Sequence, residues 1–403
     1  MGFFGKSNGF SALEMSPEGF SRSIGVLETG IREGVAPGML AAFWSASRPG
    51  VYYFCARGDR SVIPDRAPVD VDTVFDFASV SKVVATTAAI ARLRDRGWIG
   101  WDTPLRAVLP RFRYTDITVR HLLSHTSGLP AWKALFEEIK LRLGADQIVR
   151  HPVRARQDLM RDLVYEIERV AASEIQMVYS DISFLLLGFV IEELCGKPLD
   201  TAVAELVWEP LGLLSRQYGN PSIGYRRVTR TLAESRDLQC AATENCPWRG
   251  GVLQGQVHDD NTWCMGGFAG HAGVFGTARD LLVFARGIWE GGFFTPETTR
   301  EMATPVHRPL GCSRALGWDT PSGDAPSFGS RFSRKSIGHL GYTGTSLWLD
   351  VERGIAVTLL TNRLHPFGAD QVAGTTRQNE KIRPFRGKFH DALFDDLKYS
   401  RIL

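Results

Sequence analysis

Segments with the pattern of β-strands lie near both ends of this chain, and helical patterns fill the interval between them. Towards the N-terminus, residues 39–46 and 51–56 are apolar runs on either side of a Ser-Arg-Pro-Gly turn. Towards the C-terminus, residues 345–350 and 355–361 flank Glu-Arg-Gly in the same way. Strands need neighbours to satisfy their backbone hydrogen bonds, so formation of one sheet would bring the two ends of the chain together.

This pattern predicts an α/β (α+β) fold in which helices flank an antiparallel sheet and a mainly helical domain is inserted. We predict that residues 1–100 and 273–403 form one discontinuous sheet domain and that residues 101–272 form the inserted domain. Apolar residues at helical spacing predict flanking helices over 16–34 and 385–397. The insertion shows the same spacing in four segments, residues 135–143, 156–172, 184–195 and 201–207.

Two local signals mark the region between the insertion and the second part of the sheet. Residues 215–265 are polar and rich in Gly and Arg, which predicts a long loop. Thr277, with Asp280 three residues later, has the pattern of a helix N-cap, and Gly291 is expected to end that helix.

Composition limits the classes of function. The 403 residues include 47 basic and 44 acidic side chains, a net charge of +3 that argues against nucleic acid as a partner. We expect no membrane span, because no run of 18 apolar residues occurs. The six cysteines form no CxxC pair, so we expect neither a cofactor nor a metal site. The N-terminus shows no secretory signal, so we expect a cytoplasmic location, or a periplasmic one if an export signal has been removed.

A candidate nucleophile lies in Ser79-Val80-Ser81-Lys82, where an apolar run gives way to a helix. Residues three apart share a helix face, so Lys82 can lie over Ser79. The helix N-terminus favours developing negative charge on Ser79, and an amine in its neutral form can act as a base. The alternative is a helix cap beside a solvated lysine. The small, mostly apolar continuation to Leu93 indicates a buried helix and favours the catalytic interpretation.

Two other segments carry polar side chains next to apolar runs. Tyr179-Ser180-Asp181 precedes the apolar helix that ends near residue 195, where capping and packing are the alternative to a chemical role. His339-Leu340-Gly341 is expected to open a strand, and its alternative is a loop with a solvated histidine. A glycine in a strand is typical of a place where another backbone or a substrate approaches closely.

Taken in order, these three segments resemble the Ser-x-x-Lys, Tyr-x-Asn and Lys/His-Thr-Gly motifs of the serine β-lactamase-like superfamily. The likeness is to its branch of class C β-lactamases, DD-peptidases and esterases. Residues 117–130, 270–281 and 359–363 also resemble this family, and the likeness extends from about residue 20 to 395.

The resemblance implies a role for each matching residue. Ser79 would attack a carbonyl and form an acyl-enzyme, while Lys82 and Tyr179 would share the proton transfers. The backbone N–H groups of Ser79 and Tyr342 would hold the oxyanion. His339 would be the fourth catalytic residue, at a position where many members carry lysine.

Three substrate-binding positions follow from the same motifs, Asp181, Gly341 and Leu340. Asp181 replaces the usual Asn, and an ionised carboxylate only accepts hydrogen bonds. If it reaches Lys82, it would keep that amine protonated and shift the role of base to Tyr179. Leu340 replaces a Thr and is expected to make the pocket more apolar. A neutral His339 offers no permanent cation to a substrate carboxylate, which favours ester hydrolysis.

The leading hypothesis is therefore a serine hydrolase, a carboxylesterase with weak β-lactamase activity, whose partner is a small-molecule ester or amide. One alternative is a DD-peptidase or β-lactamase that acts on D-Ala-D-Ala peptides or β-lactams. Another is a non-catalytic binding protein that keeps the fold. The sequence leaves the oligomeric state open. It also leaves open whether His258 and His271 line the site or are structural, and whether Trp132 and Trp263 line an acyl pocket or pack.

Overall fold

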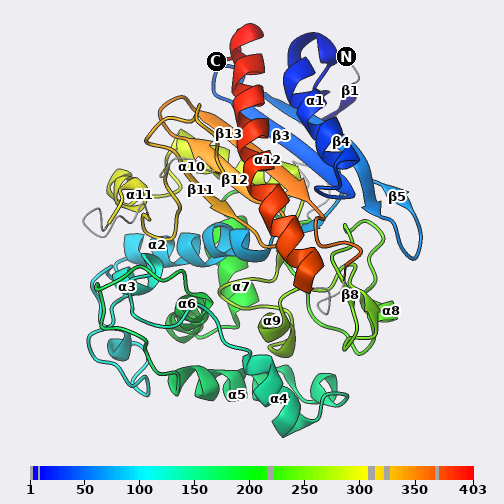
Figure 1. Ribbon diagram of the computed structural model, residues 1–403. Helices are drawn as coiled ribbons and strands as arrows, with labels where there is room; N and C mark the ends of the chain where they lie inside the picture. The colour runs from blue at the N-terminus through cyan, green and yellow to red at the C-terminus, as the bar shows by residue number, and fades with distance from the viewer. Residues whose placement is uncertain (1–2, 8–9, 216–221, 307–313, 322–326, 368–371) are drawn as a thin grey trace.

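The main sheet takes strands from both ends of the chain, as predicted. The computed structural model describes residues 3–7, 10–215, 222–306, 314–321, 327–367 and 372–403. The order across the sheet is β1 (Phe3–Ser7), β2 (Phe10–Glu14), β4 (Val51–Ser61), β3 (Gly38–Ser45), β13 (Ile355–Thr361), β12 (Ser346–Asp350) and β11 (Ile337–Leu340), and β5 (Ala67–Pro68) pairs with β4 (Figure 1).

The two ends of the chain join at the centre of this sheet. β13 pairs antiparallel with β3, in a register that runs from Ile355 opposite Ser45 to Thr361 opposite Met39. Every pair on the path is antiparallel except β2 with β4, which is parallel. The sequence patterns did not predict β1 and β2, which extend the sheet beyond β4 at one edge.

Two long helices cover one face of the sheet, α1 (Pro17–Arg32) and α12 (Val372–Tyr399), as Figure 1 shows. Apolar side chains from both helices pack with Phe43, Tyr53 and Trp348 of the sheet in one cluster. A buried carboxylate joins the helices, because Asp396 accepts hydrogen bonds from the Ser23 N–H and Oγ, both at 2.8 Å. The predicted helix over 385–397 is the C-terminal part of a longer one.

The opposite face of the sheet holds the larger hydrophobic cluster, and α10 (Ala278–Glu290) packs against it. Thr277 caps α10 in a capping box with Asp280, and Gly291 is its C-cap, as predicted. The helix that begins at Ser79 also belongs to this cluster. It starts as a 3-10 turn (Ala78–Val80), continues with π-helical geometry (Lys82–Thr87) and becomes α2 (Ala88–Asp95). Its residues from Val83 to Ala91 are all buried, as the sequence predicted.

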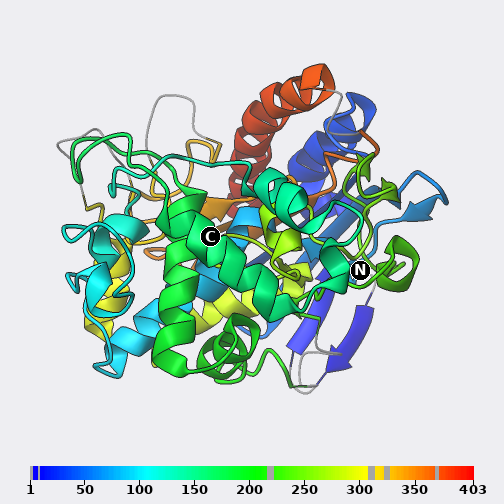
Figure 2. The ribbon, with the colours of Figure 1, turned by 90° about the horizontal axis from the view of Figure 1, so that it is seen from below.

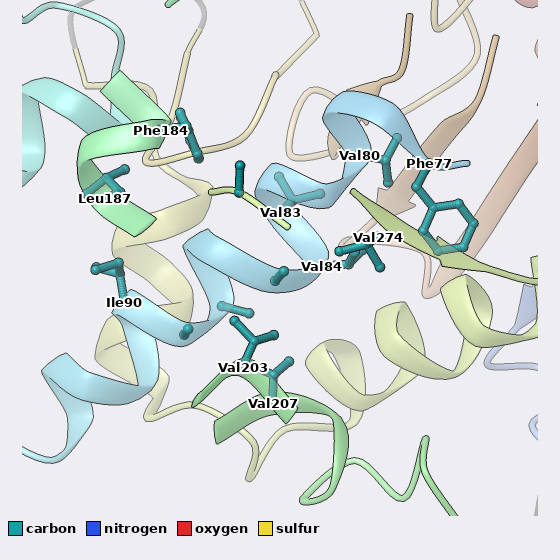
Figure 3. Packing of buried hydrophobic residues seen from close by; sticks show 14 of the residues in the cluster. Phe77, Val80, Val83, Val84, Ile90, Phe184, Leu187, Val203, Val207 and Val274 are labelled. Atoms are coloured by element: carbon teal, nitrogen blue, oxygen red, sulfur yellow. The ribbon is translucent and has the colours of Figure 1, made fainter. Parts of the chain in front are cut away.

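A helical layer packs beneath this segment (Figure 2). Figure 3 shows Val83, Val84 and Ile90 among side chains such as Phe184 and Val207. The layer contains α3 (Val119–Leu123), α4 (Leu135–Leu143), α5 (Val153–Tyr165), α6 (Asp181–Cys195), α7 (Leu199–Val203), a π-helical turn (Ala204–Trp208) and α9 (Asp260–Cys264). In Figure 1, α8 (Leu232–Ser235) lies to the right of it and α11 (Pro296–Ala303) lies to the left, beside the sheet. The cluster is continuous between sheet and helices, and the division into two domains stays a prediction.

The prediction for the insertion needs two corrections. The helix expected over 156–172 begins at Val153 and ends at Tyr165. The expected loop contains short elements as well as α8 and α9. The short elements are three strands. β7 (Gly224–Tyr225) pairs in a small sheet with β10 (Val274–Gly276), which also pairs with β6 (Phe75–Asp76), and β8 (Asn245–Cys246) pairs with β9 (Gly251–Val252). Within the described part of the chain, no helix is long and apolar enough to span a bilayer.

Candidate active site

The backbone that carries Ser79 is held in an unusual conformation. The preceding residue, Ala78, has φ of 46°, a left-handed value that is costly for any residue with a Cβ. Its N–H donates to Asp76 Oδ1 at 2.9 Å, and Asp76 Oδ2 accepts the N–H of His258 at 2.7 Å. The buried carboxylate therefore fixes the turn that presents Ser79, and it ties this turn to the segment around His258.

Lys82 is buried directly behind the nucleophile. Its Nζ donates to Ser79 Oγ at 2.9 Å and to the His271 carbonyl at 3.2 Å, and it forms an ion pair with Asp181 Oδ1 at 2.6 Å. Burial opposes a charge on this amine, but Asp181 and then Tyr179 outweigh burial and raise the pKa of Lys82. The amine thus donates two hydrogen bonds, and the Asp181 carboxylate balances its charge. We conclude that Lys82 is charged at rest and that Asp181 reaches it, as the sequence suggested.

Asp181 and Tyr179 owe their positions to the start of α6. Ser180 caps the helix, because its Oγ accepts the N–H of Ser183 at 3.1 Å and donates to the Pro130 carbonyl at 2.7 Å. The capping interpretation of this motif therefore holds for Ser180, while its two neighbours are free to contact Lys82.

The ring of Tyr179 lies among basic side chains. Its centroid is 4.8 Å from Lys82 Nζ, 4.8 Å from the guanidinium carbon of Arg314 and 4.6 Å from the ring of His125. Burial raises the pKa of Tyr179 in spite of the nearby charge on Lys82. The phenol is therefore protonated at neutral pH and can transfer a proton only while it accepts another.

His339 is the last but one residue of β11, and its ring centroid lies 6.0 Å from that of Tyr179. Its Nδ1 donates to the Leu340 carbonyl at 2.9 Å, which leaves Nε2 as the unprotonated nitrogen. Burial, assisted by the charges of Arg314 and Lys82, lowers the pKa of His339 well below its ordinary value. The imidazole is neutral at pH 7, as expected from the sequence.

The turn after β11 brings Tyr342 next to the nucleophile. Thr343 Oγ1 donates to the Asp76 carbonyl at 2.8 Å, and Thr345 Oγ1 donates to the Phe77 carbonyl at 2.9 Å. The N–H of Tyr342 has no partner among the described residues. Ser79 lies in the first turn of its helix, where N–H groups have no intrahelical partner. Both donors proposed for an oxyanion are therefore available.

Gly341 is required by packing rather than by room for substrate. A Cβ at this position would lie 2.0 Å from Thr345 Oγ1 and 2.5 Å from the Phe77 carbonyl oxygen. Arg386 of α12, which sequence analysis missed, donates to the carbonyls of Gly341 at 3.2 Å and Thr345 at 2.8 Å. The close approach predicted at this glycine is thus made by the protein's own backbone.

One cavity of about 420 Å³ lies at this site. Ser79, Tyr179, Asp181 and Tyr342 line it, whereas Lys82, His339 and Gly341 do not. Leu340 does not line it either, which argues against its assignment to substrate binding. Successive side chains of a strand point to opposite faces, so Leu340 packs in the cluster under α12, behind the site.

The structure also answers what the sequence left open about the two histidines. His258 and His271 both line the cavity, and each has a carboxylate partner. His258 Nε2 lies 2.9 Å from Glu244, which outweighs burial and raises the pKa of His258. His271 Nε2 lies 2.8 Å from Asp259.

The two tryptophans differ. Trp132 lines the cavity, and Trp263 packs against Trp248 outside it. Within the residues described, no group of three His, Cys, Asp or Glu side chains could hold a metal ion.

Sequence reasoning missed Asp76, Arg314 and Arg386. Asp76 had one detectable signal, an acidic residue between Phe75 and Phe77 in an apolar run. The two arginines gave none, because only the fold brings them to the site.

A serine in contact with a buried lysine, beside a tyrosine and an aspartate on this mixed α/β fold, is typical of a serine hydrolase of the β-lactamase fold. The chain belongs to the Beta-lactamase family, whose family model matches residues 29–379.

Two bacterial relatives illustrate the similarity. A putative D-alanyl-D-alanine carboxypeptidase of Escherichia coli (strain K12) is 28% identical over 334 residues, which cover 74% of this chain and 71% of the relative. An N-acetylmuramyl-L-alanine amidase of Bacillus subtilis (strain 168) is 28% identical over 321 residues, which cover 74% and 70%.

Solved structures share the fold. EstCE1, described as a hydrolase with promiscuous acyltransferase activity, is 22% identical with a TM-score of 0.66, covering 92% of this chain and 98% of its own. Simvastatin synthase (LovD) from Aspergillus terreus is 16% identical with a TM-score of 0.65, covering 96% and 100%.

Proposed function

We propose that this protein is a carboxylesterase that hydrolyses small esters without a free carboxylate, through an acyl-enzyme on Ser79. The observation that carries the proposal is the contact between Ser79 Oγ and a buried Lys82 that Asp181 keeps charged. A serine that only caps a helix does not require this buried ion pair beside it. Desolvation of each charge costs on the order of several kcal/mol, so the pair is more readily explained by a role in catalysis.

The substrate preference rests on charge. His339 is neutral, and no lysine or arginine occurs among the described residues that line the cavity. Asp181, Asp259 and Asp260 line it, and each lies beside a basic side chain, so the described lining offers no unpartnered cation to a carboxylate. This arrangement favours neutral esters over D-alanyl-D-alanine peptides and β-lactams, both of which carry a carboxylate.

In the proposed acylation, Ser79 Oγ bonds to the ester carbonyl carbon. The Ser79 proton passes to the Tyr179 oxygen while Tyr179 passes its own proton to the alcohol oxygen, whose bond to carbon breaks. Tyr179 therefore stays neutral throughout, as its raised pKa requires. Water takes the place of the alcohol and reverses these transfers in deacylation. The N–H groups of Ser79 and Tyr342 stabilise the oxyanion, and the Lys82 ammonium holds Ser79 and Tyr179 in place.

The test compares p-nitrophenyl acetate and butyrate with nitrocefin on the wild type and on Ser79→Ala. We expect ester turnover that falls at least about 10³-fold in the variant, with unchanged circular dichroism, and nitrocefin turnover far below that of the esters. A fluorophosphonate probe should label Ser79. Full ester turnover in Ser79→Ala would refute the mechanism, and a preference for nitrocefin would favour the β-lactamase or DD-peptidase alternative. Absence of both labelling and turnover would favour the binding protein.

A further inference from the structure

Two aromatic side chains stand half-exposed in the cavity that contains Ser79. Trp132 and Tyr342 both line it, and they are 48% and 46% exposed. Large rings of this kind contribute most to recognition when a ligand covers them. The mechanism uses the backbone N–H of Tyr342 but neither of the two rings.

The ring of Trp132 is fixed from behind by a row of aromatic side chains. Its centroid lies 6.3 Å from that of Phe136, which stacks on Trp248 at 6.0 Å, and Trp248 meets Trp263 edge-on at 5.1 Å. The ammonium of Lys140 lies 4.4 Å from the Trp248 ring and 5.0 Å from the Phe136 ring. The contact with this ordered row restricts the Trp132 ring before a ligand arrives.

Tyr342 is held in a similar way. The guanidinium carbon of Arg363 lies 4.8 Å from the centre of its ring, and the His258 ring lies at 5.7 Å. Rings that are already ordered lose little conformational freedom on binding, so their contacts add to affinity and selectivity. The cavity of about 420 Å³ is large enough for a small ester with a ring.

We propose that Trp132, together with the ring of Tyr342, binds a flat, uncharged aryl group of the ester substrate. The group is uncharged because the described lining of the cavity offers no unpartnered cation to bind an anion. This inference rests on the proposed esterase function, because it takes the ligand to be an ester. The aryl group can belong to the acyl part or to the alcohol part, and the experiment separates the two.

The turnover arm uses alkyl esters, because p-nitrophenol is itself an aryl group. Ethyl phenylacetate against ethyl cyclohexylacetate tests the acyl part, and benzyl acetate against cyclohexylmethyl acetate tests the alcohol part, with acid release followed in a pH-stat. We expect the wild type to prefer the aryl ester in one pair by about tenfold in kcat/KM. Trp132→Ala should abolish that preference and Trp132→Phe should retain most of it.

The matched control is Trp98→Ala, because Trp98 is 51% exposed and does not line the cavity. It should leave the aryl preference intact. An equal fall for both members of each pair in Trp132→Ala, or the same loss of preference in Trp98→Ala, would overturn the proposal, as would a wild type without any preference.

A binding arm does not depend on turnover. Ser79→Ala and the double variant Ser79→Ala/Trp132→Ala are titrated calorimetrically with ethyl phenylacetate and benzyl acetate. We expect Kd to rise about tenfold in the double variant for the preferred ester. If the wild type hydrolyses no ester, the proposed function is refuted. The titration still shows, independently of turnover, whether Trp132 binds the aryl group. An unchanged Kd would refute that role.

Discussion

Lys82 and His339 are two nitrogen bases in one site, and their surroundings shift their pKa values in opposite directions. Both side chains are buried, and burial alone would discharge either of them. Lys82 has the carboxylate of Asp181 at 2.6 Å and stays charged. His339 has no carboxylate within hydrogen-bond distance among the described residues, faces the charges of Arg314 and Lys82, and is neutral.

The difference shows that the acidic partner, rather than the type of base, decides the charge at each position. A lysine at position 339, as in many members of the superfamily, would enter a region that already holds two cations. The histidine is compatible with the charged Lys82–Asp181 pair because it adds no third charge. The following experiments change one member of the comparison at a time.

The largest effect is expected when the carboxylate is removed. In Asp181→Asn, burial dominates and the pKa of Lys82 falls, so the alkaline limb of kcat/KM should move to lower pH. The pKa of Lys82 is higher in the folded than in the unfolded chain, so its charge stabilises the fold at every pH below the unfolded pKa. In the variant, the free energy of unfolding at pH 7 should therefore fall by about 3 kcal/mol, as when other buried ion pairs lose one partner.

Denaturant unfolding and a pH–rate profile measure both effects. The control is Asp162→Asn, which removes the exposed partner of Arg111 and should change stability by less than about 0.5 kcal/mol. An alkaline limb that stays in place in Asp181→Asn would contradict the role given to that carboxylate.

A smaller, opposite pH dependence is expected from His339. Its lowered pKa means that, below about pH 6.5, the unfolded chain takes up a proton that the folded chain does not, so stability is lost as pH falls. In His339→Gln, the free energy of unfolding should therefore fall less steeply with decreasing pH, by up to about 1.4 kcal/mol per pH unit. Urea unfolding at pH 7, 6 and 5 tests it, with His151→Gln outside the site as the control. Equal pH dependence in His339→Gln and the wild type would show that the histidine is not held neutral.

The smallest effect concerns the neighbour of His339. Leu340 points to the other face of β11, so Leu340→Ala should cost about 1–2 kcal/mol of stability. KM for p-nitrophenyl acetate should stay within twofold of the wild type. A rise in KM without loss of stability would return Leu340 to the substrate site.

Much of the fold was predictable because local signals agree with the tertiary structure. The helix over 135–143 has the bounds that its apolar spacing indicated, and Thr277 caps α10 as its sequence pattern required. The strands β1 and β2 were missed, and so was the short structure within residues 215–265. Short segments carry too little periodicity for their partners to be recognised.

The sequence by itself determined the order and identity of the groups that we propose to react, Ser79, Lys82 and Tyr179, since side-chain chemistry and spacing within a motif are local properties. It also determined that Asp181 and His339 replace an amide and a lysine. Only the tertiary structure decided their charges and their neighbours. Burial and the distance to a neighbouring charge set each pKa. Both depend on segments that are far apart in the chain, as when Asp181 of α6 lies beside Lys82 and Arg314 acts on His339.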